Sequence, residues 1–120
     1  MSFQRFVAVS AFALASSATS SAFAHAKLQS SDPQAGSTLA HAPRQLRLKF
    51  DEALEPAFSK IRLVGPAGRV IPVTATVDKT DPATMSAPLP ALPAGGYRVQ
   101  WSAMAHDGHK TKGEFTFQVK

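Results

Sequence analysis

Hydrophobic and polar residues alternate along several short stretches of this chain. Leu46, Leu48 and Phe50 alternate with polar residues, and residues 97–103 and 114–120 repeat the pattern. Successive side chains of a β-strand point to opposite faces of a sheet, so this period predicts strands with one buried and one solvated face. Beyond the N-terminal segment, no stretch has the period of an amphipathic helix.

Turn-forming residues separate the predicted strands. Proline, glycine and aspartate recur between them, roughly every 8 to 12 residues. Pro72 lies within one predicted strand and has no N–H to donate, which predicts an edge strand there. The predicted strands cover residues 25–30, 44–50, 58–64, 70–77, 97–103 and 114–120, and residues 84–89 form either a weak strand or an irregular stretch. About seven short strands predict an all-β fold, a Greek-key antiparallel β-sandwich of the cupredoxin or immunoglobulin-like type.

Aromatic residues on the hydrophobic faces of these strands form the predicted core. Large apolar side chains at alternating positions are usually buried. The predicted core aromatics are Phe50, Phe58, Tyr97, Trp101, Phe115 and Phe117.

The N-terminal segment has the pattern of a secretory signal peptide. Arg5 precedes an apolar run over residues 6–15, and a small-residue stretch ends in Ala-Phe-Ala. The run is shorter than the roughly 20 apolar residues that cross a bilayer. An uncleaved anchor or a buried first helix fits less well, because serines interrupt the apolar face. We therefore expect a cleaved signal peptide over residues 1–24, one domain over residues 25–120 and a periplasmic location.

Composition argues against several classes of protein. The chain has no cysteine, which excludes disulfides and thiolate metal sites. The formal net charge is +5, but the basic residues stand singly, so no nucleic-acid partner is expected. The sequence has no glycine-rich phosphate loop, no Gly-x-Ser-x-Gly motif and no cysteine nucleophile, so we expect no enzyme.

Two histidines and one aspartate are the candidate metal ligands. Cleavage after residue 24 makes His25 the first residue, and its free α-amine and ring Nδ1 can chelate one ion. Asp107 and His109 lie two residues apart in a polar loop and can face one point. Three nitrogen donors and one oxygen donor in a flattened four-coordinate set suit Cu(II). The same spacing is also typical of a tight turn without a metal, and the spacing alone leaves both possibilities open.

Two more residues are weaker candidates. His106 has the opposite parity to Asp107 and His109, which favours a solvent-facing side chain over an alternative ligand or a partner of a ligand. Glu52 follows a predicted core strand and is either a solvated turn carboxylate or a group that supports a metal ligand. Met85 and Met104 are isolated in the sequence, so they do not predict a sulfur-rich Cu(I) site.

Three segments resemble the CopC copper-resistance proteins. Residues 25–36 read His-Ala-Lys-Leu-Gln-Ser-Ser-Asp-Pro-Gln-Ala-Gly, and residues 48–52 read Leu-Lys-Phe-Asp-Glu. Residues 96–109 read Gly-Tyr-Arg-Val-Gln-Trp-Ser-Ala-Met-Ala-His-Asp-Gly-His, and Gly-Glu-Phe-Thr-Phe-Gln-Val follows at residues 113–119. The resemblance covers essentially the whole chain after the predicted signal peptide.

The resemblance implies a small periplasmic β-sandwich that binds one Cu(II) ion per chain through His25, Asp107 and His109. It also implies that Glu52 lies near the site, and that the protein is a copper buffer or carrier in copper homeostasis and resistance. An inner-membrane copper transporter is the implied partner, and we expect a monomer. Many members hold Cu(I) in a loop rich in Met and His. Residues 63–74 contain neither, so no Cu(I) site is expected.

Two other functions stay open at this point. A histidine-brace copper centre also resembles that of oxidative polysaccharide-cleaving enzymes, which would make the protein a copper oxidase or oxygenase. The short chain and the carboxylate among the candidate ligands argue against that activity. The third possibility is a metal-free immunoglobulin-like interaction domain.

Overall fold

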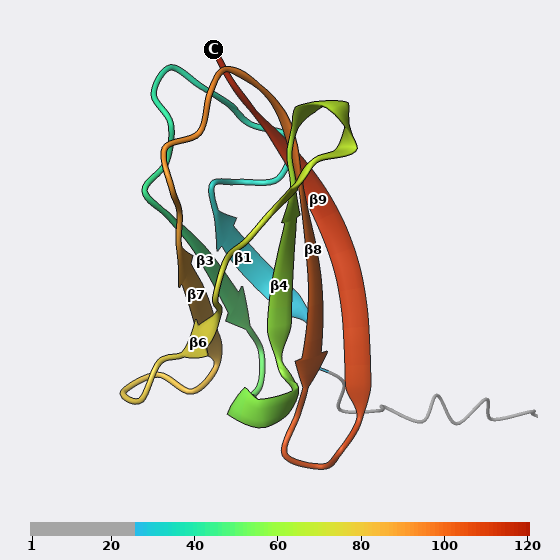
Figure 1. The fold of residues 1–120 in the computed structure, drawn as a ribbon. Coiled ribbons are helices and arrows are strands. Elements are labelled where there is room, and N and C mark those ends of the chain that lie inside the picture. Colours follow the sequence, from blue (N-terminus) through green and yellow to red (C-terminus); the bar gives the residue numbers. More distant parts are fainter. Residues whose placement is uncertain (1–25) are drawn as a thin grey trace, which may run out of the picture.

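A computed structural model describes residues 26–120 as a sandwich of two β-sheets (Figure 1). Its strands are β1 (Leu28–Asp32), β2 (Thr38–Leu39), β3 (Gln45–Phe50), β4 (Lys60–Val64), β5 (Val70–Ile71), β6 (Thr76–Val77), β7 (Thr84–Pro88), β8 (Gly95–Met104) and β9 (Lys110–Val119). One sheet has the order β1-β3-β7-β6 and the other the order β2-β9-β8-β4-β5. The predicted all-β sandwich is confirmed. The predicted signal peptide and His25 lie outside the described residues.

The core lies between the sheets, where the alternation buries one face of each strand. Leu46, Leu48 and Phe50 of β3 are at most 1% exposed and belong to the same buried cluster as Val99 of β8 and Phe117 of β9. Burying a side chain of this kind contributes about 1.5–3 kcal/mol relative to leaving it in water. The hydrophobic alternation is therefore the main reason that these segments form a sandwich.

The described residues contain nine strands, two more than predicted. The predicted strand over residues 70–77 divides at Pro72: β5 pairs with β4 in one sheet, and β6 pairs with β7 in the other. Pro72 cannot donate a ladder hydrogen bond, which favours a crossing from one sheet to the other at this point. Both pieces are edge strands, as Pro72 predicted. The second addition, β2, has only two residues and pairs in parallel with β9, so the sheets are not wholly antiparallel.

Phe58 was wrongly predicted as a core residue, because its ring is 52% exposed. It ends the short 3-10 turn η1 (Pro56–Phe58), and β4 begins only at Lys60, so the strand alternation does not reach it. Trp101 is half-buried rather than buried. Its ring packs edge-on against Phe50, with 5.0 Å between ring centroids.

One end of the sandwich carries the long hairpin formed by β8 and β9. The turn of this hairpin lies at the bottom of Figure 1, beside η1, and the C-terminus lies at the opposite end. The predicted ligand loop is this turn. No helix within residues 26–120 is long and apolar enough to span a membrane.

Candidate metal centre

Residues 105–109 form the tight turn that joins β8 to β9. The N–H of Ala105 donates to the carbonyl of His109 at 3.1 Å, and the N–H of Gly108 donates to the carbonyl of Ala105 at 3.0 Å. Gly108 has a φ of +86°, a left-handed conformation that glycine adopts without steric cost. The sequence left a tight turn and a ligand loop as alternatives. The turn is present, and it does not exclude the ligand loop.

Asp107 and His109 lie side by side in this turn. Oδ2 of Asp107 is 2.9 Å from Nδ1 of His109, and Oδ1 of Asp107 accepts a hydrogen bond from the His109 N–H at 2.9 Å. Both residues are exposed. The carboxylate therefore holds both the backbone and the ring of His109, and one of its oxygens lies within 2.9 Å of a ring nitrogen.

The two residues that follow His25 in sequence are fixed close to this hairpin. Thr111 Oγ1 on β9 donates a hydrogen bond to the carbonyl of Ala26 at 2.8 Å, and Ala26 is 1% exposed. Asp51 holds Lys27 twice: its Oδ1 accepts from the Lys27 N–H at 2.6 Å, and its own N–H donates to the Lys27 carbonyl at 3.0 Å. We call Thr111 and Asp51 the N-terminal clamp.

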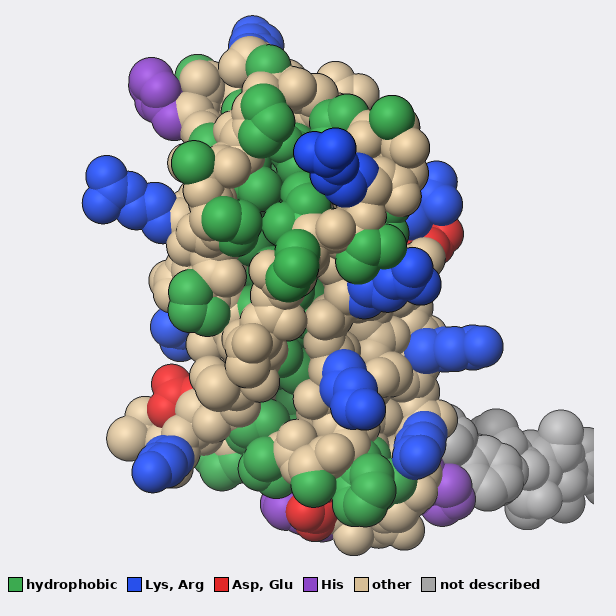
Figure 2. Space-filling model, in the orientation of Figure 1, with side chains coloured by type: hydrophobic (Ala, Val, Ile, Leu, Met, Phe, Trp, Pro, Cys, Tyr) green, Lys and Arg blue, Asp and Glu red, His purple; other side chains and the backbone are tan. Residues whose placement is uncertain are grey.

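His106 contacts a different carboxylate. Its Nδ1 lies 2.5 Å from Oε1 of Glu55, and its side chain is 60% exposed. The N–H of Glu55 also donates to the carbonyl of Met104 at 2.8 Å, so the segment before η1 is attached to the end of β8. Figure 2 shows His and Asp or Glu side chains together at this end of the molecule. His106 is therefore on the surface, as its parity predicted, and it braces the turn from the side.

The other candidate residues lie elsewhere or make no contact here. Glu52 is half-buried and forms no hydrogen bond or ion pair within the described part of the chain. Met85 is fully buried in the core, and His41 is exposed in the loop before β3. Among residues 26–120, no group of three His, Cys, Asp or Glu side chains could hold a metal ion. Asp107 and His109 therefore supply a pair of ligands, and a site needs a further donor.

The sequence did not reveal the clamp or the contact between His106 and Glu55. Thr111 shares the inward parity of Phe115 and Phe117 on β9, and a polar residue at an inward position was the available signal. Asp51 and Glu55 stand with Glu52 in one polar turn of the sequence, where a solvated carboxylate is the simplest interpretation. Nothing in the local pattern distinguishes them from Glu52, because their partners are distant in sequence.

The fold and the pair formed by Asp107 and His109 define a class of protein: a small β-sandwich with a candidate metal centre at the turn of its longest hairpin. The CopC domain family model matches residues 28–120, and the chain belongs to the CopC family. This confirms the resemblance found in the sequence.

Three similar proteins illustrate the match. Copper resistance protein C of Escherichia coli is 44% identical over 108 residues, which cover 83% of this chain and 85% of that protein. The crystal structure of CopC from Methylosinus trichosporium OB3b has a TM-score of 0.77 and 28% identity, covering 80% of this chain and 94% of that chain. Copper transport protein CutJ of Bacillus subtilis (strain 168) is 32% identical over 99 residues, which cover 81% of this chain but only 18% of that longer protein.

Proposed function

We propose that this protein is a periplasmic Cu(II)-binding protein that buffers or carries copper in copper homeostasis and resistance. One ion binds per chain through the α-amine and ring of His25, the carboxylate of Asp107 and the ring of His109. The α-amine becomes available when the signal peptide over residues 1–24 is removed. The role is binding rather than catalysis, in keeping with relatives that are named for copper resistance and copper transport.

The observation that carries the proposal is the hydrogen bond from Thr111 to the Ala26 carbonyl. Thr111 is two residues beyond His109 on β9, and Ala26 is the residue directly after His25. The N-terminal donor is therefore separated from an anchored residue by a single peptide unit, and consecutive Cα atoms are only 3.8 Å apart. The clamp therefore supports a site in which His25 and the Asp107–His109 pair bind the same ion.

The spacing within the pair also supports joint coordination. Two donor atoms that bind one ion at right angles, each about 2.1 Å from it, lie about 3 Å apart. The Oδ2 of Asp107 and the Nδ1 of His109 are 2.9 Å apart. Copper would take the place of the proton between them, and a nitrogen-rich set with one carboxylate suits Cu(II).

Glu52 and His106 have supporting roles in this proposal. His106 is paired with Glu55 and stays outside the ligand set. Glu52 follows Asp51 of the clamp and supports the site without binding copper. Residues 63–74 offer no methionine or histidine, so the protein holds no Cu(I) site.

The partner that we propose is an inner-membrane copper transporter, with the protein acting as a monomer and without nucleic acid. A region like this chain occupies 18% of the longer copper transport protein CutJ. In CutJ the matched region is joined to the rest of a copper transport protein. A separate chain of this family could bind a separate transporter in the same way.

Cu(II) titration of histidine variants tests the ligand set. We expect His109→Ala to weaken Cu(II) binding by at least about 100-fold, because it removes a ligand. His106→Ala and the control His41→Ala each remove an exposed imidazole outside the set, and both should bind within about threefold of wild type. Affinity that falls equally in all three variants, or that falls in His106→Ala alone, contradicts the assignment.

A further inference from the structure

The outer face of the five-stranded sheet carries an unusual share of the basic residues. Side chains of β4, β8 and β9 that point away from the core include five Lys or Arg and one acidic residue. In Figure 2, blue side chains gather over the region where these strands run in Figure 1. We call this surface the basic face; its charged residues are Lys60, Arg62, Arg98, Lys110, Lys112 and Glu114.

The basic face accounts for the whole net charge of residues 26–120. Arg5 is the only charged residue before residue 26, so the described part has twelve basic and eight acidic residues, a net charge of +4. Five basic residues and one acidic residue give the basic face the same +4. On the other sheet, Arg47 pairs across strands with Asp32 and lowers the pKa of Asp78, after the larger effect of hydrogen bonds from Thr80. Positive charge is balanced there, but not on the basic face.

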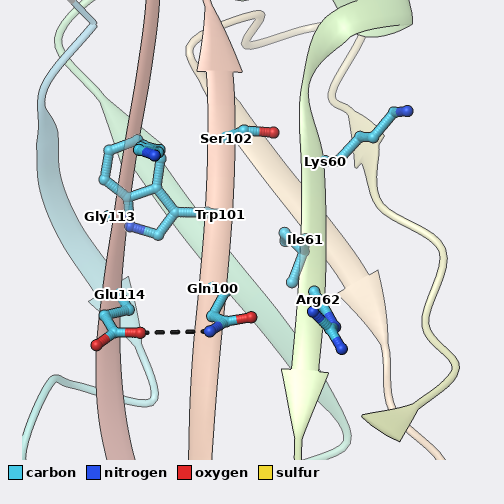
Figure 3. Close-up of a pocket in the computed structure, with 9 residues that line it drawn as sticks. Lys60, Ile61, Arg62, Gln100, Trp101, Ser102, Gly113 and Glu114 are labelled. Atoms are coloured by element: carbon cyan, nitrogen blue, oxygen red, sulfur yellow. Dashed lines mark hydrogen bonds between the residues drawn. The ribbon is translucent and has the colours of Figure 1, made fainter.

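The basic face has a hollow at its centre. A shallow groove of about 700 Å³ lies there, where Gln100 and Ser102 of β8 stand between the longer side chains of β4 and β9 (Figure 3). Lys60 and Arg62 border it on β4, and Lys112 borders it on β9. At about 3.4 Å per residue, the basic rows extend roughly 20 Å along the strands.

Exposed hydrophobic side chains stand at two borders of the basic face. Phe58 and Val70 are the exposed large hydrophobic residues of the described part, at 52% and 47%. The ammonium of Lys110 lies 5.5 Å from the centroid of the Phe58 ring. Val70 pairs with Val64 on β5, the edge strand next to β4. Basic residues with apolar residues at their border are typical of proteins that lie on a membrane surface.

We infer that the basic face docks on an anionic phospholipid surface. The lysines and arginines contact phosphate groups, and the rings and methyl groups of Phe58 and Val70 enter the headgroup layer. An acidic protein would satisfy the charges, but it gives no reason for a border of exposed apolar residues. Docking would place the β8–β9 turn beside the bilayer, because Phe58 precedes β4 at the same end of the molecule. The inference does not depend on copper binding.

Vesicle binding by two charge-matched variants tests this inference. Arg62→Glu/Lys112→Glu changes the basic face, whereas Arg44→Glu/Lys79→Glu makes the same charge change in exposed residues outside it. All proteins are purified by the same procedure. The mass of each is measured to establish that all of them begin at the same residue. Co-sedimentation uses mixed phosphatidylcholine and phosphatidylglycerol vesicles, at low and high salt, beside pure phosphatidylcholine vesicles.

We expect wild type to bind the mixed vesicles at low salt and to dissociate at high salt. Each basic residue near an anionic bilayer strengthens binding about fivefold, so the face variant should bind at least about 25-fold more weakly and the control within about threefold.

Arg62→Gln/Lys112→Gln repeats the test if the charge reversal unfolds the protein. Equal losses in face and control variants would overturn the inference. Absent vesicle binding would also overturn it, even if an acidic protein bound the face. Cu(II) affinity measured on the same variants reports separately on the proposed copper site.

Discussion

Ala26 and Lys27 show how single hydrogen bonds can fix the residues that follow a proposed ligand in sequence. Three hydrogen bonds hold these two residues: one from Thr111 and two involving Asp51. None of these atoms is a proposed ligand. They limit where the N-terminal donor can move, and ordering a flexible terminus in advance lowers the entropy that binding must overcome.

Replacing Thr111 by Val tests the clamp. The substitution keeps a β-branched side chain in β9 and removes only the donor to Ala26. One hydrogen bond is worth about 0.5–1.5 kcal/mol net, so Cu(II) affinity should fall about threefold to tenfold. Thr116→Val is the matched control, because Thr116 is exposed on the same strand and points away from the core. Competitive titration against a chelator measures both. Unchanged affinity in Thr111→Val would mean that the clamp does not position the ligand.

Residues of the site divide into those that the sequence could identify and those that it could not. Asp107 and His109 could be identified because a carboxylate and an imidazole lie two residues apart. Their contact joins residues that are close in sequence, so a local pattern is enough to predict it. Thr111, Asp51 and Glu55 act across separations of 85, 24 and 51 residues. Those contacts exist only after the sheets have formed, and no local pattern reveals them.

Strands were predicted well where alternation was long and regular. The prediction for residues 44–50 differs by one residue from β3, because three buried residues alternate there without interruption. β9 begins four residues earlier than predicted because polar residues near the turn continue the ladder without continuing the hydrophobic pattern. β8 gains Gly95 and Gly96 at the end away from the turn and Met104 beside it. β2 was missed because two residues cannot display a period. The pattern thus predicts strands that form the core and misses strands that only complete an edge.

Tyr97 on β8 links the strand to the loop before it, and its removal tests that link. Its hydroxyl donates to the carbonyl of Pro93, and its ring stacks on Phe117 with 5.2 Å between centroids. Tyr97→Phe keeps the stacking and loses the hydrogen bond, so the free energy of unfolding at pH 7 should fall by about 1 kcal/mol. Urea denaturation measures the change.

Burial raises the pKa of Tyr97 above its usual value near 10. A group whose pKa is raised in the folded state contributes stability below its unfolded pKa and loses that contribution as pH rises above it. The difference in unfolding free energy between wild type and Tyr97→Phe should therefore shrink above about pH 10. A difference that stays constant up to pH 11 would contradict the role of burial.

Two functions occupy different parts of the whole molecule in this account. The β8–β9 turn and the N-terminal clamp form the end at which we propose copper binding, whereas the basic face extends along the side of the five-stranded sheet. The sequence predicted the sandwich and the closeness of Asp107 and His109, but it did not reveal the basic face. The basic residues stand singly in the sequence, and only the pairing of β4, β8 and β9 brings them together.

Cu(II) affinity of protein with and without one extra residue before His25 tests the central claim most directly. An alanine inserted after Ala24 moves the free α-amine away from the imidazole of His25 and leaves every side chain in place. The start of each purified protein is established by mass. We predict that the extension weakens Cu(II) binding by at least about 100-fold, because it removes the amine and imidazole chelate. Equal affinities for the two proteins would contradict a copper site built on the N-terminal histidine.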